Sequence, residues 1–192
     1  QADSKTVASR RSKNSKIQQE VVYTLSRFQL GTVCICSKGF MFINQICKVL
    51  QNAKIPYAIV GGYAVALHGA PRGTFDVDFV IQWSLENLQK TEMVLKSLGL
   101  VSRLPIDAEM LFHFRDEYVT KRHLITWNFY DPLKPSHQVD IVITFDLKKA
   151  KTKTIKSLGG DIKILSIKDL IKMKRASGRA QDLEDIQALE QL

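Results

Sequence analysis

Two aspartates, Asp76 and Asp78, stand two positions apart at the start of an apolar segment that runs to Ile81. Residues two apart in a β-strand point to the same face, so both carboxylates would point into the same space. Adjacent carboxylates repel each other unless a divalent cation or a shared proton lies between them. The pair is therefore a candidate metal-binding site.

A glycine pair, Gly61 and Gly62, precedes the aspartates and follows a short apolar strand predicted over 57–60. Glycines at a strand-to-helix turn let backbone amides approach an anion, and the amino end of a helix adds a partial positive charge. A turn at 71–73 then leads the chain into the strand that carries the aspartates. Together these segments predict a phosphate-sized gap that faces two acids.

This stretch resembles the signature of the nucleotidyltransferase superfamily, which has the fold of DNA polymerase beta. The family pattern is a Gly-Ser or Gly-Gly pair, an Asp-x-Asp on the next strand and a third aspartate on a later strand. Here those positions are Gly61 and Gly62, then Asp76 and Asp78, then Asp140. Gly-Gly replaces the commoner Gly-Ser, so a hydroxyl that often touches a phosphate is missing.

A helix predicted from Ser166 to Gly178 follows a short strand predicted over 162–165, and Ser166 is a plausible amino-terminal cap. At about 100° per residue, four cations fall on one stripe of this segment, and Lys174 lies on the apolar side instead. A lysine there either extends to solvent or reaches into a cleft. The four cations are Lys168, Lys172, Arg175 and Arg179.

The carboxyl-terminal residues resemble the helix pair of the AbiEii-like and MenT-like toxin nucleotidyltransferases. That pattern has a lysine in an apolar helix, an arginine a turn later, and a Lys-Asp followed by a second helix. Lys174, Arg179 and Asp182 match it, whereas Gln181 stands where many relatives have lysine. The resemblance covers the chain from Phe40 to its end.

The resemblance implies transfer of a nucleoside monophosphate from a nucleoside triphosphate to an acceptor hydroxyl, with release of pyrophosphate. Asp76 and Asp78 would hold two Mg²⁺ or Mn²⁺ ions, and Asp140 would hold the second metal or accept the proton of the acceptor. The amides of Gly61 and Gly62 would bind the β- and γ-phosphates.

Three cations would neutralise the triphosphate, namely Arg72, Lys174 and Arg179. Asp182 would contact these cations without touching the triphosphate itself. Arg72 fits an exposed arginine in a Pro-Arg-Gly turn equally well.

The net charge of +9 comes from 28 lysines and arginines against 19 acids, and the excess is concentrated near residues 1–16 and in 148–179. Such clustering favours a polyanionic partner, although a solubilising surface would look the same. RNA, such as tRNA, and a restraining antitoxin are the partners that the toxin resemblance implies.

No run of residues approaches the length of a membrane span, so no membrane partner is expected. The three cysteines do not form a disulfide framework, which predicts reduced thiols and a cytoplasmic protein.

We expect an α/β (α+β) nucleotidyltransferase fold, a mixed sheet flanked by helices with an amino-terminal helix and a carboxyl-terminal helix pair. Leu111–Phe114 and His123–Tyr130 are predicted strands, and Ser84 is predicted to cap a helix to Leu98. The expected organisation is a basic flexible tail (1–16), a helix and connector (17–38), the catalytic core (39–160) and a helical segment packed on it (161–192).

Two alternative functions are compatible with the same residues. A small-molecule nucleotidyltransferase of the aminoglycoside or lincosamide type would need an acidic pocket for a cationic drug, yet acids outside the triad are not concentrated in any stretch. A non-catalytic nucleotide- or nucleic-acid-binding module would be expected to lack one carboxylate of the triad. All three are present, which favours an enzyme, although a fold alone does not fix a function.

Overall fold

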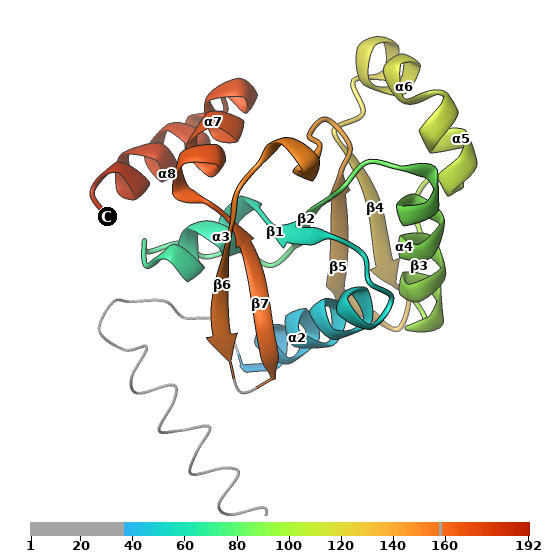
Figure 1. Cartoon of the computed structure of the whole chain (residues 1–192), viewed down its shortest axis with the longest axis horizontal. Coiled ribbons are helices and arrows are strands. Elements are labelled where there is room, and N and C mark those ends of the chain that lie inside the picture. The colour runs from blue at the N-terminus through green and yellow to red at the C-terminus, as the bar shows by residue number, and fades with distance from the viewer. Residues whose placement is uncertain (1–36, 158) are drawn as a thin grey trace, which may run out of the picture. The chain divides into compact units, whose positions relative to one another are not determined.

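A seven-stranded mixed sheet is the centre of the computed structural model, which describes residues 37–157 and 159–192. The strand order is β3-β4-β5-β2-β1-β7-β6; β2 and β5 are parallel, as are β1 and β7, and the other neighbouring pairs are antiparallel. The predicted tail (1–16) and the helix predicted within 17–38 lie outside the described residues. The expected mixed sheet flanked by helices is confirmed (Figure 1).

The seven strands differ in length, and β5 in the interior of the sheet is the longest with 9 residues. They are β1 (Tyr57–Ile59), β2 (Val77–Ile81), β3 (Val101–Ser102), β4 (Thr126–Asp131), β5 (Lys134–Val142), β6 (Thr152–Ser157) and β7 (Gly160–Leu165). The helices are α2 (Ser37–Asn52), α3 (Gly61–His68), α4 (Leu85–Ser97), α5 (Ala108–His113), α6 (Arg115–Arg122), α7 (Ile167–Ser177) and α8 (Ala180–Glu190), with a 3₁₀ turn η1 (Leu147–Lys149).

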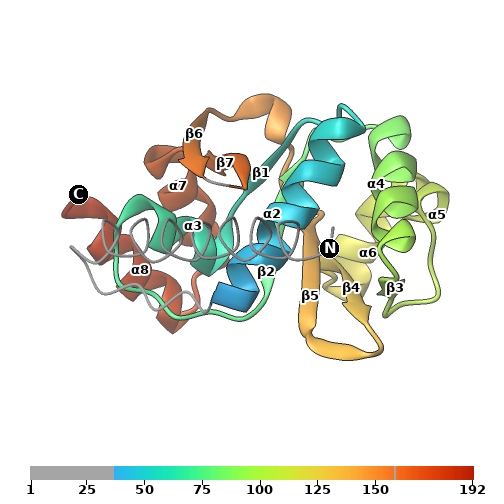
Figure 2. The same ribbon diagram turned by 90° about the horizontal axis from the view of Figure 1, so that it is seen from below.

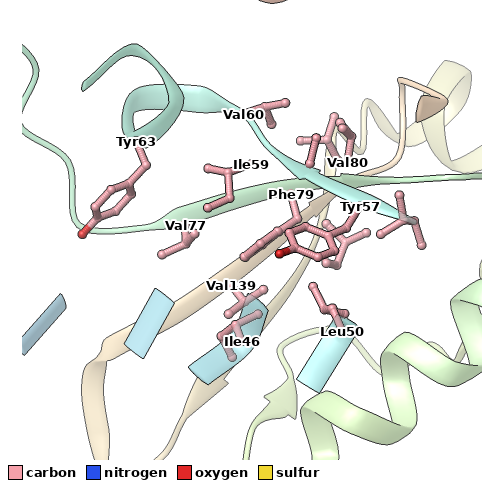
Figure 3. Close-up of a cluster of buried hydrophobic side chains, with 14 of the residues drawn as sticks. Ile46, Leu50, Tyr57, Ile59, Val60, Tyr63, Val77, Phe79, Val80 and Val139 are labelled. Carbon is pink, nitrogen blue, oxygen red and sulfur yellow. The ribbon is translucent and has the colours of Figure 1, made fainter. Parts of the chain in front are cut away.

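Helix α2 lies across one face of the sheet, as the view from below shows (Figure 2). Its Ile46 and Leu50 are fully buried and lie near the rings of Tyr57 and Phe79 (Figure 3). Val80 points to the opposite side of the strands from Phe79 in the same view. Since neighbouring residues of a strand alternate between faces, Asp78 also points away from α2.

The capping serines seen in the sequence correctly predicted where two helices begin. Ser84 accepts a hydrogen bond from the Asn87 amide at 3.1 Å and begins α4, and Ser166 accepts one from the Asp169 amide at 3.3 Å and begins α7. Gly178 ends α7 in the left-handed region with φ 68°. Arg179 therefore lies beyond the helix and not on its stripe, which corrects the prediction for that residue.

The predicted carboxyl-terminal helix pair is present as α7 and α8. Leu170 of α7 and Leu189 of α8 belong to the main hydrophobic core, and both helices contact α3. Residues 161–165 lie in β7, which pairs with β6 and, in parallel, with β1. The segment after residue 160 thus contributes a strand to the sheet as well as two helices.

The strand predicted over Leu111–Phe114 is wrong, because these residues form the end of α5 and the residue that follows it. Asp107 caps this helix by accepting a hydrogen bond from the Met110 amide at 2.8 Å, and only Leu111 of the four is fully buried. The strand predicted from His123 begins at Thr126 instead. His123 has φ 52° and ends α6.

None of the helices in the described part of the chain is long and apolar enough to cross a membrane.

Candidate active site

Three polar residues stand in one row across adjacent strands, on the face opposite α2. Asp78 of β2 pairs in register with Asp140 of β5, and Asp140 pairs in register with Asn128 of β4. Side chains paired across strands share a face and lie close together. The strand pairing therefore brings the two carboxylates together from positions 62 residues apart in the chain.

A cavity of about 260 Å³ opens over this row. Its walls come from the start of α3, the loop before β2, β2 itself, the start of β4, the second half of β5 and the end of α7. The residues that line it are Gly61, Gly62, Arg72, Thr74, Asp76, Asp78, Ile125, Thr126, Asp140, Lys174 and Arg179. Every residue predicted to be catalytic or phosphate-binding is therefore in one place, while their roles as ligands remain predictions.

Gly61 begins α3 directly beside the Asp78 carboxylate. Its φ is +61°, and a Cβ atom at this position would lie 1.8 Å from Asp78 Oδ2. Only glycine adopts this conformation without strain and leaves this space for the carboxylate. The first amides of a helix have no acceptor inside it, so Gly61 and Gly62 offer donors at the wall of the cavity.

Thr74 fills the space that a side chain at position 62 would occupy. A Cβ atom on Gly62 would lie 2.8 Å from Thr74 Cβ and 3.1 Å from Thr74 Oγ1. The Thr74 hydroxyl donates a hydrogen bond to Asp76 Oδ1 at 3.2 Å and lies on the cavity wall. The cavity thus contains a hydroxyl next to the glycine pair although the Gly-Ser serine is missing.

The carboxylates in the row are held in an environment that disfavours their charge. Burial, with smaller contributions from the charges of Asp140 and Asp76, raises the pKa of Asp78 to about 7. Burial also raises the pKa of Asp140, and a hydrogen bond from Asn128 opposes that shift. Acids with raised pKa values beside one another are typical of functional sites.

Asn128 holds Asp140 in place through a chain of hydrogen bonds. The Asn128 side-chain amide donates to Asp140 Oδ1, and Arg103 Nε donates to Asn128 Oδ1 at 2.8 Å. The guanidinium of Arg103 lies 5.0 Å from the ring centre of Tyr130. Because Asn128 accepts from Arg103, its NH₂ group is directed at the carboxylate, which favours the ionised form of Asp140.

The cations of the cavity are bound by two buried acids of α8. Lys174 Nζ, only 4% exposed as a residue, contacts Asp182 Oδ1 at 3.0 Å and Asp185 Oδ2 at 2.6 Å. Arg179 Nε donates to Asp182 Oδ2 at 2.8 Å, and Arg72 Nε lies 3.1 Å from Asp185 Oδ1. Lys174 therefore reaches into the cleft, and three cations share two carboxylates, which leaves one net positive charge.

Asp78 and Asp140 have no comparable partner, and neither has Asp76, which lies just before β2 and not on the strand as predicted. Within residues 37–157 and 159–192, Asp76, Asp78 and Asp140 form no ion pair with lysine, arginine or histidine. No three His, Cys, Asp or Glu side chains of those residues stand together as a preformed metal-binding group. The donor set fits a hard divalent cation nevertheless, since carboxylate oxygens are the ligands that Mg²⁺ and Mn²⁺ take. A bound cation would also supply the counter-charge without which a buried carboxylate is unfavourable.

The mixed sheet flanked by helices is similar to the fold of solved nucleotidyltransferase structures. An antigenic nucleotidyltransferase-like protein from Paracoccidioides brasiliensis is 22% identical, with a TM-score of 0.51 over 80% of this chain and 76% of that one. A candidate nucleotidyltransferase from Thermotoga maritima is 16% identical, with a TM-score of 0.54 over 80% and 92%. The lincomycin-bound lincosamide adenylyltransferase LnuA is 13% identical, with a TM-score of 0.53 over 81% and 97%.

No family model and no curated protein matches the sequence. At these identities the structural likeness shows the fold alone. The nearer relationship to AbiEii-like and MenT-like toxins therefore stays a prediction.

Sequence reasoning missed several residues of the site. Thr74 lies in the loop between the glycine pair and the aspartates and could have been noticed as a hydroxyl beside the motif. Asn128 and Ile125 carry no local signal, because their position depends on the register of β4 against β5. Asp185 follows Asp182 by three residues, the spacing that places two side chains on one face of a helix, and this signal was available.

Proposed function

We propose that this chain transfers a nucleoside monophosphate from a nucleoside triphosphate to an acceptor hydroxyl and releases pyrophosphate. The observation that supports this best is the pair Asp78 and Asp140, in register on adjacent parallel strands. The pair forms no ion pair with a cation of the described residues and lies beside the start of α3 at Gly61. Phosphoryl chemistry of this kind depends mainly on positioning and on electrostatic stabilisation. The acids and the amides supply both.

Each wall of the cavity has its own task in this mechanism. Asp76, Asp78 and Asp140 would hold the divalent ions, which supply charge neutralisation and lower the pKa of the acceptor hydroxyl when bound. The amides of Gly61 and Gly62 bind the terminal phosphates. Arg72 and Arg179 also line the cavity and orient the triphosphate through hydrogen bonds.

The bond changes follow from this arrangement. The acceptor oxygen attacks the α-phosphorus, the bond from that phosphorus to the bridging oxygen of the β-phosphate breaks, and pyrophosphate leaves with the bonding electrons. The hydroxyl proton passes to Asp140 or to solvent. Asn128 keeps Asp140 oriented toward the cavity during this step.

We propose RNA as the acceptor and a small molecule as the second candidate. The fold neighbour LnuA is an adenylyltransferase of lincosamide antibiotics, which is the observation that favours the second. A cationic drug would need acids beyond the three that would hold the metal ions, however, and the nearby Asp182 and Asp185 are already bound by three cations. This pairing supports an anionic acceptor instead.

The test is transfer of label from each α-labelled nucleoside triphosphate, with Mg²⁺, to total tRNA or to aminoglycosides and lincosamides. The control is the Asp76→Ala/Asp78→Ala chain, for which we expect a loss on the order of 10²- to 10³-fold, because the metal ligands are gone. Label on RNA that depends on both aspartates supports the proposal. Equal labelling by the double variant, or none from any nucleotide, contradicts it.

A toxin role belongs to the same proposal and rests on the residues that resemble the toxin helix pair, Lys174, Arg179 and Asp182. Induced expression of the active chain would then arrest the growth of a bacterial host, and the Asp76→Ala/Asp78→Ala chain would not. Normal growth with an enzyme that labels RNA in vitro would remove the toxin role and leave the transfer reaction standing.

A further inference from the structure

Five lysines gather around the beginning of α7. The Lys151 amide donates to Asp169 Oδ2 at 2.9 Å, and the Ser166 amide donates to the Lys151 carbonyl at 2.8 Å. These bonds join the chain after η1 to the first turn of α7. We name the resulting patch the lysine surface; it consists of Lys148, Lys149, Lys151, Lys168 and Lys172.

The lysine surface carries positive charge that the described residues do not pair. All five lysines are exposed, and none forms an ion pair within 37–157 and 159–192. Lysines of α4 and α6 behave differently, since Lys90, Lys96 and Lys121 each lie within 4.0 Å of a glutamate one turn earlier. Those three lysines are thus paired with acids, whereas the five lysines of the lysine surface are not.

The nearby acids are bound by backbone amides. Asp146 accepts hydrogen bonds from the amides of Trp83 and Lys148, both at 3.0 Å. Asp169 accepts from the Lys151 amide and the Ser166 hydroxyl. Five lysines against these two acids leave about three net positive charges on the patch, a density typical of surfaces that bind phosphates.

Helix α7 connects the lysine surface to the cavity. Lys168 and Lys172 stand one turn apart on its exposed side, and Lys174 and Arg179, near its other end, line the cavity. At 1.5 Å per residue, this helix of 11 residues spans about 16 Å. A polyanion lying along the exposed side of α7 would therefore reach the cavity.

We propose that the lysine surface binds the sugar–phosphate backbone of the nucleic-acid acceptor and directs its reactive end to the cavity. This inference rests on the proposed RNA acceptor and names the surface that holds it. Contacts from lysine to phosphate give affinity without sequence selection, so base recognition would come from elsewhere in the chain.

Protection of a sheet edge and attachment to a membrane account for these lysines less well. Lysines on an edge strand protect it against pairing with other chains, but none of the five lies in the edge strand β6. A membrane surface would need apolar anchors among the lysines. The large exposed apolar side chains of the described residues include none from η1, β6, β7 or α7.

The experiment measures binding of fluorescently labelled tRNA to the Asp76→Ala/Asp78→Ala chain by anisotropy over a series of salt concentrations. In this background four lysines of the surface are replaced, Lys148→Gln, Lys149→Gln, Lys168→Gln and Lys172→Gln. The matched control replaces four lysines elsewhere, Lys48→Gln, Lys90→Gln, Lys96→Gln and Lys121→Gln. Both variants lose the same net charge, so a difference between them reports position.

We expect the surface variant to lose at least about tenfold in affinity, and its slope of log Kd against log salt to fall by about 0.7 to 0.9 for each phosphate contact removed. The control should stay close to the parent. Equal tRNA affinities and salt slopes of the two variants overturn the proposal. It is also overturned if the surface variant keeps its tRNA affinity but loses binding to anionic vesicles.

The same chains with Asp76 and Asp78 restored separate this inference from the proposed function. Label transfer to RNA with no effect of the lysine replacements overturns the surface alone. RNA binding through the lysines without label transfer overturns the reaction and keeps the surface. Absence of RNA binding by every chain overturns the surface and the RNA acceptor together.

Discussion

At the scale of single residues, Gly61 is a position that does not tolerate a side chain. Gly61→Ala would combine a strained φ of +61° with a Cβ atom 1.8 Å from Asp78 Oδ2. We expect a loss of stability of about 1 kcal/mol or more from the backbone alone, and a loss of transfer activity on the order of 10²-fold as the carboxylate is displaced. Denaturant titration and label transfer measure the two effects.

Gly73→Ala is the matched control for this change. Gly73 lies in the loop before the same aspartates, its φ is outside the left-handed region, and nothing lies within 4 Å of a Cβ atom there. This variant should keep its stability and its activity. A Gly61→Ala chain that behaves like the Gly73→Ala chain would show that the backbone at Gly61 does not position Asp78.

The raised pKa of Asp78 predicts a pH dependence of stability in the absence of divalent ions. The folded chain binds a proton at Asp78 up to about pH 7, whereas an unfolded aspartate releases it near its ordinary pKa of 3.8. Between these values the folded state holds more protons, so the free energy of unfolding falls as pH rises. The fall should amount to a few kcal/mol and level off above pH 7.

Asp78→Asn removes this titration and should flatten the profile between about pH 4 and 7 relative to the parent chain. Burial is the largest cause of the raised pKa, and the charged groups that modify it are Asp140, Asp76, Arg179 and Lys174. Mg²⁺ should also oppose the fall, because it favours the ionised carboxylate. Parallel profiles for the parent and the variant, measured by denaturant titration with a chelator, would contradict the assignment.

Local sequence patterns predicted the residues whose partners lie close along the chain, whereas Asp140 was predicted from the family resemblance. The glycine pair and the two aspartates form one continuous signature, and the capping residues Ser84 and Ser166 bond to amides three residues later. Asn128 could not be found in this way, because it reaches Asp140 only through the pairing of β4 with β5. Register is a property of two strands, and one strand's pattern does not contain it.

At the scale of elements, α8 stabilises the cavity through the acids on its inner face. Asp185→Asn would leave the buried Lys174 with Asp182 as its remaining carboxylate and would take away the partner of Arg72. Removing one member of a buried ion-pair network is destabilising by about 3 to 5 kcal/mol, and the amide oxygen of asparagine should recover part of that. Chemical denaturation should therefore show a loss of about 2 kcal/mol or more.

Glu184→Gln tests whether this effect belongs to the inner face of α8. Glu184 is exposed on the same helix and accepts a hydrogen bond from Gln181. Its replacement should change stability by about 0.5 kcal/mol or less, as is usual for surface positions. Equal effects of the two substitutions would mean that the network around Lys174 contributes no special stability.

The helices that the sequence analysis did not predict are those with few apolar residues at helical spacing. Helix α6 has no buried residue, so no periodicity marked it, and its neighbour α5 buries only Ala108 and Leu111. Aromatic residues near Leu111 favoured a strand by propensity, but the Asp107 cap and packing against α4 decide for a helix. Where burial is slight, local capping is the stronger signal.

At the scale of the whole molecule, the order of strands in the sheet could not be predicted. β2 lies between β1 and β5, and β7 returns from the end of the chain to pair with β1. These pairings join segments far apart in sequence, and many orders satisfy the same apolar patterns. The family resemblance supplied the fold, whereas the residues alone supplied a mixed sheet with helices.

The sheet holds the acids of β2 and β5, the amides of α3 and the cations near α7 around one cavity, so binding of a nucleotide with Mg²⁺ should stabilise all of them at once. A ligand at 100 times its Kd adds about 2.7 kcal/mol, which for a domain of this size corresponds to a rise in Tm of about 5 to 10 °C. The rise should require nucleotide and Mg²⁺ together and disappear with a chelator. Thermal unfolding followed by circular dichroism with each nucleoside triphosphate measures it, and the triphosphate with the largest rise identifies the preferred base.

The Asp76→Ala/Asp78→Ala chain is the control for this stabilisation. It should show little rise in Tm, because its missing carboxylates are the part of the cavity that needs a cation. A triphosphate without Mg²⁺ would meet only one net positive charge from the network of three cations and two acids. A full rise in that chain would place the nucleotide on Arg72, Lys174 and Arg179 alone. The assignment would then change from a metal-dependent transferase to a nucleotide-binding module, since binding would no longer depend on the acids that the reaction requires.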